Sequence, residues 1–140
     1  MVKGITYRLV NDDLVQERVG TKANDNTKYK VFSGAAGQEE KAPYIVVRQS
    51  GKIPFECKDI VATTFQYRYD VHSYHKNYEG AEELDLAVIA ALPLQDNTVI
   101  NGVVFQEIRH VNTIDVFNED YMLHGKISSF EAIVNEDQAT

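Results

Sequence analysis

The chain has 140 residues, of which 44 % are hydrophobic and 25 % charged, and its formal net charge is −7. A chain of this length and composition forms one ordinary globular domain with its own core, which excludes a disordered or fibrous protein. Cys57 is the only cysteine, so an intramolecular disulfide and a cysteine-based metal cage are excluded too.

Charge and hydropathy exclude further classes of partner. The Lys and Arg residues are scattered, whereas duplex binding needs several cations on one face. The N-terminal residues lack the apolar run of a signal peptide, and the most apolar stretch, Leu84 to Leu94, is too short for a bilayer. We expect no specific nucleic-acid binding, no export by that route and no membrane partner. A reducing cytoplasm fits the single cysteine.

The first twenty residues predict two short helices. Ile5 and Leu9 repeat at helical spacing, which predicts an opening helix. Asn11-Asp12-Asp13 predicts a break and a new N-cap, because acidic residues suit a helix N-terminus. The second helix is expected to stop at Gly20.

Two loops and two strands are expected next. Thr21 to Lys28 is polar and predicts a loop, Tyr29 to Phe32 predicts a short strand, and Ser33 to Ala42 predicts a second loop. Pro43 sets the entry of a strand from Tyr44 to Gln49, whose β-branched residues suit burial on both faces. Ser50 to Pro54 predicts a turn.

The segment from Thr63 to Tyr74 carries the clearest alternation in the chain. One face of this strand holds Phe65, Tyr67, Tyr69 and Val71, and the other holds Gln66, Arg68, Asp70 and His72. One face must pack on a core while the other meets water or a partner. Arg68, His72 and Tyr74 are candidates to face a partner, and packing of the aromatic residues in the core is the competing interpretation.

The second half predicts a helix followed by strands. Asn77 caps the main helix, whose apolar stripe Pro93 ends. Asn101-Gly102 predicts a tight hairpin turn, and Thr113 to Asp120 an acidic connector. The last strand, Tyr121 to Val134, changes its apolar parity, which a bulge near Ser128-Ser129 would reconcile. The order predicts one α+β domain spanning 1–140, with a mostly antiparallel (mixed) sheet and two main helices packed on one face.

The sequence offers no arrangement typical of an enzyme. His72 and His75 are three residues apart in a predicted strand, so they point to opposite faces and suit a shared metal poorly. Asp12-Asp13 and Glu82-Glu83 are explained by helix N-termini. Ser33 to Gly37 lacks the Gly-Lys-Ser/Thr ending of a phosphate loop. We expect no catalytic residues, no metal and no cofactor.

Five segments occur in a recognisable order. They are the opening helix through Asn11-Asp12-Asp13-Leu14-Val15 to Val19-Gly20, the strand Pro43-Tyr44-Ile45-Val46-Val47, the strand Tyr67 to Val71, the helix Ala81 to Leu92, and the closing strand Lys126 to Val134. Across nearly the whole chain this set resembles the tail-terminator (tail-completion, or tail-to-head joining) proteins of long-tailed bacteriophages. The chain departs from that pattern in the longer loop Thr21 to Ala42 and in the aromatic- and His-rich segment Tyr74 to Asn77.

The resemblance implies a structural subunit that acts in a virion, at the head-proximal end of the tail, after assembly in the host cytoplasm. It implies a hexameric ring that caps the tail tube, stops its polymerisation and presents the surface that joins the head. The implied partners are copies of the chain, the tail-tube protein and a head-completion or connector protein, and DNA passes through the lumen without specific binding. The free subunit could stay monomeric until it meets the tube.

The net charge of −7 suggests a hypothesis about the lumen, where carboxylates would repel DNA phosphates. The lumen-facing candidates are Asp25, Glu39, Glu40, Asp115, Glu119 and Asp120. The segments Thr21 to Ala42 and Thr113 to Asp120 are expected to be mobile in the free subunit and to order on contact with the tube. Two alternatives stay open: another phage neck, head-completion or tail-assembly protein, and a small hydrolase or ligand-binding domain that uses the His72/His75 region.

Overall fold

The structure is a computed structural model that describes residues 2–19, 31–34, 42–54, 64–100 and 102–135. Within these ranges there are three helices, α1 (Val2–Val10), α2 (Asp13–Val19) and α3 (Tyr78–Ala91). One sheet contains six strands, β1 (Val31–Ser33), β2 (Tyr44–Pro54), β3 (Thr64–His75), β4 (Thr98–Ile100), β5 (Val103–Asn118) and β6 (Leu123–Asn135).

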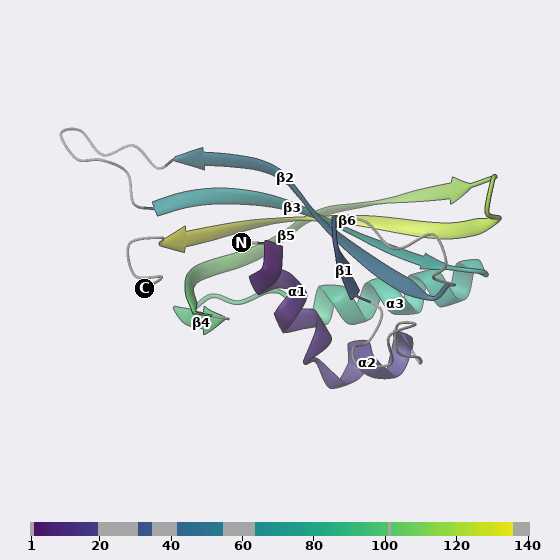
Figure 1. Ribbon diagram of the computed structural model, residues 1–140, viewed down its shortest axis with the longest axis horizontal. Helices are drawn as coiled ribbons and strands as arrows, with labels where there is room; N and C mark the ends of the chain where they lie inside the picture. Colours follow the sequence, from purple (N-terminus) through teal and green to yellow (C-terminus); the bar gives the residue numbers. More distant parts are fainter. Residues whose placement is uncertain (1, 20–30, 35–41, 55–63, 101, 136–140) are drawn as a thin grey trace.

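The strands lie in the order β1-β2-β3-β6-β5-β4 (Figure 1). β1 runs parallel to β2, and each of the other neighbouring pairs is antiparallel. This confirms the α+β class with a mostly antiparallel, mixed sheet. The expectation of two main helices on one face is not confirmed, because the described chain has three helices. α1 and α3 contact strands, whereas α2 packs mainly against α3.

Side-chain caps define the starts of two helices, as the sequence predicts. The Asp12 carboxylate accepts a hydrogen bond from the Val15 N–H at 3.0 Å, and the side-chain Oδ1 of Asn77 accepts one from the Gly80 N–H at 2.6 Å. Each bond satisfies a donor that the first turn of a helix leaves without an intrahelical partner. α3 ends at Ala91 with Leu92 as its C-cap, because Pro93 has no backbone N–H with which to continue the helix.

The core lies between the helices and one face of the sheet, here called the helix side. Tyr67, Tyr69 and Val71 of β3 point to it and are buried, whereas Arg68 points to the opposite face, here called the open side. This confirms the alternation predicted for β3. Other large core residues come from five elements and the C-cap of α3: Ile5, Leu9, Ile45, Leu84, Leu92, Phe105, Ile108 and Phe130. Among the described residues, no helix has the length and apolar character needed to span a membrane.

Two segments predicted to be irregular are strands. Residues 50–54 continue β2 with an irregularity between Gln49 and Gly51, so the turn predicted at Ser50 to Pro54 is wrong. Residues 113–118 belong to β5 and pair with β6, so most of the predicted connector Thr113 to Asp120 is wrong too. At 50–54 pairing with β3 outweighs a turn-like composition, whereas at 113–118 Ile114, Val116 and Phe117 themselves favour a strand.

The bulge predicted at Ser128-Ser129 is also wrong. β6 keeps a continuous register with β3, and the irregularities lie in β5, between Phe105 and Glu107 and between His110 and Asn112. An extra residue in β6 would disturb ladders on both sides, whereas in β5 it disturbs mainly one. The parity change in β6 has another cause: Phe130 is buried on the helix side and Leu123 on the open side.

Candidate assembly surfaces

A buried polar network crosses the helix side of the sheet. Ser128 Oγ donates to Asp85 Oδ1 at 2.5 Å, and its oxygen lies 2.8 Å from Thr113 Oγ1, which lies 2.8 Å from His110 Nε2. Asp85 is 4 % exposed, and burial raises the pKa of its carboxyl group. A hydroxyl, an imidazole and a carboxylate are therefore present, but the hydroxyl bonds the carboxylate directly and is buried. The network ties α3 to β5 and β6, which is a structural role.

Two of the three partner-facing candidates form an aromatic cluster on the open side. His72 Nδ1 lies 3.1 Å from the Tyr74 hydroxyl, and the Tyr74 ring packs against Tyr44 at 5.3 Å between centroids. Burial lowers the pKa of His72 and raises that of Tyr74. Gly125 makes room for this ring, since a Cβ there would lie 2.9 Å from Tyr74. Both candidates are half-buried in a packed cluster.

The two neighbouring histidines separate as predicted. His72 lies on the open side of β3, whereas the ring of His75 lies against α3, where a Cβ on Gly80 would meet it at 2.3 Å. His75 Nδ1 also accepts a hydrogen bond from the Asn77 N–H at 3.2 Å. Among the described residues, no three His, Cys, Asp or Glu side chains gather as a metal site would require.

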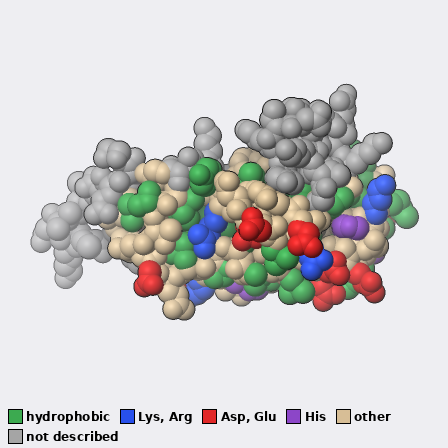
Figure 2. Space-filling view, turned by 90° about the horizontal axis from the view of Figure 1, so that it is seen from below, with side chains coloured by type: hydrophobic (Ala, Val, Ile, Leu, Met, Phe, Trp, Pro, Cys, Tyr) green, Lys and Arg blue, Asp and Glu red, His purple; other side chains and the backbone are tan. Residues whose placement is uncertain are grey.

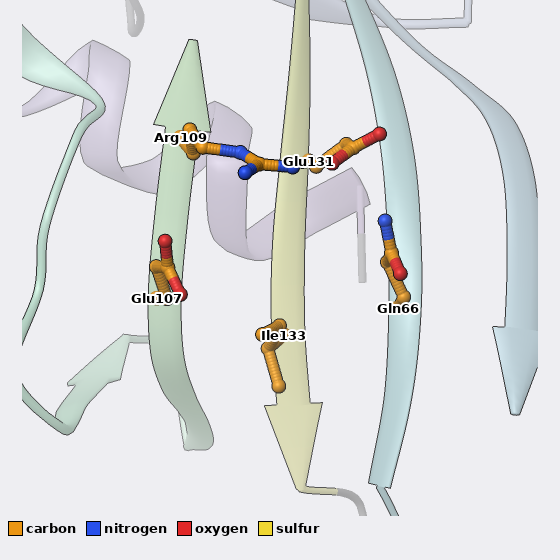
Figure 3. Close-up of a pocket in the computed structure, with 5 residues that line it drawn as sticks. All are labelled: Gln66, Glu107, Arg109, Glu131 and Ile133. Carbon is orange, nitrogen blue, oxygen red and sulfur yellow. Dashed lines mark hydrogen bonds and ion pairs between the residues drawn. The ribbon is translucent and has the colours of Figure 1, made fainter. Parts of the chain in front are cut away.

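Arg68, the third candidate, belongs to a charged row on the open side. Glu131 of β6 is in register with Arg68 of β3 and with Arg109 of β5, and its carboxylate forms an ion pair with Arg109 (Figure 3). The neighbouring row contributes Gln66, Glu107 and Ile133, which with Arg109 and Glu131 line a shallow hollow of about 190 Å³. The hollow is polar and open, so it suits contact with a surface better than enclosure of a small molecule.

The hairpin of β5 and β6 carries three of the six lumen candidates. Asp115 accepts hydrogen bonds from Lys126 Nζ at 2.7 Å and from the Tyr78 hydroxyl at 3.1 Å, and the Lys126 bond lowers the pKa of the Asp115 carboxyl group. Glu119 and Asp120 are exposed in the turn that joins the strands. Asp25, Glu39 and Glu40 lie outside the described residues, as does most of the segment Thr21 to Ala42.

The same hairpin exposes large apolar side chains that the sequence analysis did not single out. Ile114 is 52 % exposed, Phe117 46 %, Tyr121 71 % and Met122 67 %. The alternation of Ile114, Asp115 and Val116 is the signal that could have revealed the strand that carries Ile114 and Phe117. Viewed from the helix side, acidic side chains gather toward one end of the molecule, whereas basic ones are scattered (Figure 2). An exposed apolar and acidic hairpin is typical of a docking surface.

Comparison with known proteins yields a likeness in fold. No protein-family model matches the sequence, and no curated protein matches it significantly. Among solved structures, the chain is similar to one from a structure described as "Virion of native gene transfer agent (GTA) particle". The TM-score is 0.71 at 14 % sequence identity, and the match covers 96 % of this chain and 93 % of that one. The likeness therefore extends over the whole fold rather than a shared motif.

Proposed function

We propose that the chain is a structural subunit of a virion or virion-like particle. In this role it caps the tail tube as a ring, ends tube polymerisation and presents the surface that joins the head. The observation that carries the proposal is the likeness in fold, over 96 % of the chain, to a chain from a gene transfer agent virion. The order of sequence segments that resembles tail-terminator proteins supports the finer assignment.

The surface of the chain supports a role in assembly. The hairpin of β5 and β6 holds Ile114, Phe117, Tyr121 and Met122 in contact with solvent, although a hairpin of this length could have been closed by polar residues. Burial of apolar area against a neighbour is the main driving force for protein association. The partners under this proposal are copies of the chain, the tail-tube protein and a head-completion or connector protein.

The acidic residues of the hairpin turn fit a ring through which DNA passes. Asp120 is exposed and projects with the turn, so in a ring it can present a carboxylate to the lumen. A carboxylate there repels phosphates and keeps the genome from adhering. Replacing Asp120 with Lys is expected to make assembled rings retain duplex DNA at low salt, whereas Glu79→Lys on α3, a control with the same charge change, is expected to leave retention low.

The direct test mixes the purified chain with assembled tail tubes and examines them by electron microscopy. The proposal predicts tubes closed at one end by a ring and no further elongation when tube subunits are added. Tyr121→Ser with Met122→Ser should reduce capping at least tenfold without lowering thermal stability. Binding to empty heads without any effect on tubes would instead indicate a head-completion protein and would exclude the terminator role.

A further inference from the structure

The two outer edges of the sheet are only partly covered by short strands. β1 pairs with Ile45–Val47 of β2, while β4 pairs with Val103–Phe105 of β5, after which Ile108 forms a bridge with Leu94. Among the described residues, no strand covers the outer side of β2 from 48 to 54, here the β2 edge, or of β5 from 109 to 118, here the β5 edge. Backbone donors and acceptors on such edges are templates for another strand.

The directions of the two edges suit a second copy of the chain. β2 is antiparallel to β3, β3 to β6, and β6 to β5, so β2 and β5 of one chain run in opposite directions. A second copy in the same orientation, shifted along the strands, therefore lays its β2 edge antiparallel to the first copy's β5 edge. This contact is head-to-tail, which is the kind of contact that generates a ring.

The backbone groups on the two edges also match. Ile108 exchanges both backbone hydrogen bonds with Leu94, and the Val47 carbonyl oxygen accepts one from the Gly34 N–H. The backbone groups of Ile108 and Val47 therefore point to the outer side of their strands, away from the rest of the sheet. Successive residues of a strand direct their backbone N–H and C=O groups alternately to its two sides. When this alternation is followed through the irregularities of β2 and β5, the backbone groups of Lys52 and Asp115 also point to the outer side. Placed opposite each other, these two residues form a hydrogen-bonded antiparallel pair.

Side chains match in the same register. Lys52 and Asp115 both lie on the helix side and have opposite charges, while Ile53 and Ile114 both lie on the open side and are 63 % and 52 % exposed. Beyond the irregularity at Ser50, Arg48 then falls opposite Asn118 and next to Glu119. The β2 edge contains two cations and no carboxylate, whereas residues 113–120 contain three carboxylates and no Lys or Arg. Opposite charges on facing strands favour pairing.

This register also fits the lengths of the two edges. With the extra residue at Ser50 counted, it sets Asn118, the last residue of β5, opposite Arg48, so the incoming strand stops just before Val47, where β1 begins to cover β2. The contact therefore begins where β1 stops covering β2 and ends where β2 itself ends, at Pro54.

We propose that neighbouring subunits join by antiparallel pairing of the β5 edge of one copy with the β2 edge of the next, with Lys52 opposite Asp115 and Ile53 opposite Ile114. Closure of this contact into a ring rests on the proposed function; the pairing itself does not. Asp115 and Glu119 then lie at the junction between subunits, and Asp120 remains available to the lumen.

Disulfide cross-linking tests the register directly. The variant combines Ile53→Cys and Ile114→Cys with Cys57→Ser, so only the two introduced thiols are present. Three strand spacings and about six residues along the strand separate these positions within one chain, roughly 25 Å, so an intramolecular disulfide cannot form. Mild oxidation is expected to give a ladder of cross-linked species that ends at six subunits, and each single-cysteine variant is expected to stay uncross-linked beyond a few per cent.

Control variants separate this proposal from others. Ile53→Cys with Val99→Cys, an exposed apolar residue on β4, should cross-link at least tenfold less. Dimers formed by Ile114→Cys alone would show β5 pairing with β5 and would overturn the proposal. Absence of cross-links in a variant that still caps tail tubes would overturn the pairing and leave the proposed function standing. Cross-linked rings that fail to cap tubes would support the pairing and overturn the proposed function.

A charge exchange supplies a second test without cysteines. Arg48→Glu and Glu119→Lys are each expected to weaken self-association at least fivefold in sedimentation experiments, because each brings like charges close together across the contact. The double variant is expected to recover most of the association, since it restores opposite charges in reversed order. If the two losses simply multiply in the double variant, these residues do not come close to each other and the proposed register is wrong.

Discussion

The two halves of β5 contain similar residues in different surroundings. Phe105 and Ile108, at its start, are 0 % and 2 % exposed, and their outer side is covered by β4 and Leu94. Ile114 and Phe117, near its end, are 52 % and 46 % exposed, on the edge that no described strand covers. Both halves keep their pairing with β6. The difference shows that the strand pattern is shared, whereas one half builds the core and the other presents a surface.

Truncation of one phenylalanine in each half gives the largest expected contrast. Phe105→Ala removes a fully buried ring and should lower the free energy of unfolding by about 3–5 kcal/mol. Phe117→Ala removes a half-exposed ring that packs against His124 and should cost less than about 1.5 kcal/mol. Denaturant titrations measure both values. Equal losses would mean that the distal half is part of the core, and the comparison would fail.

The buried network at the boundary of the two halves predicts a dependence on pH. Burial raises the pKa of Asp85 in the folded chain, so folding favours the neutral carboxyl group. The stability that this group contributes is fully present below its unfolded-state pKa and is lost as the pH rises through its folded-state pKa. Asp85→Asn keeps an oxygen that accepts from Ser128 and cannot ionise. We expect its melting temperature relative to wild type to rise between pH 4 and pH 7. A constant difference across this range would contradict the assignment.

The smallest expected effect concerns two serines on opposite sides of the sheet. Ser73 is fully buried on the helix side, and its hydroxyl has no hydrogen-bond partner among the described residues. Ser129 lies on the open side and donates to Asp70 at 2.7 Å. Ser73→Ala should leave stability unchanged or raise it by up to about 1 kcal/mol, whereas Ser129→Ala should lower it by about 0.5–1.5 kcal/mol. Thermal melts at one pH compare them, and a larger loss for Ser73→Ala would reverse the interpretation.

Local signals in the sequence determined the elements whose physics is local. Asp12 and Asn77 cap helices, Pro93 closes one, and the alternation from Phe65 to Val71 specifies a strand with one buried face. These features depend on residues a few positions apart, so they hold in any fold that retains them. The α+β class follows from the order of such elements.

Only the tertiary structure decided how far each strand extends and which residues it exposes. Segments 50–54 and 113–118 are strands because β3 and β6 pair with them. The turn-like composition of 50–54 hides this pairing, whereas the alternation of Ile114, Asp115 and Val116 gives only a short local signal. Residues of β6 are buried on both faces, Phe130 on the helix side and Leu123 on the open side. The sequence thus determined the kinds of element and the acidic balance. The free edges, and the register in which they fit each other, depend on pairing between distant segments.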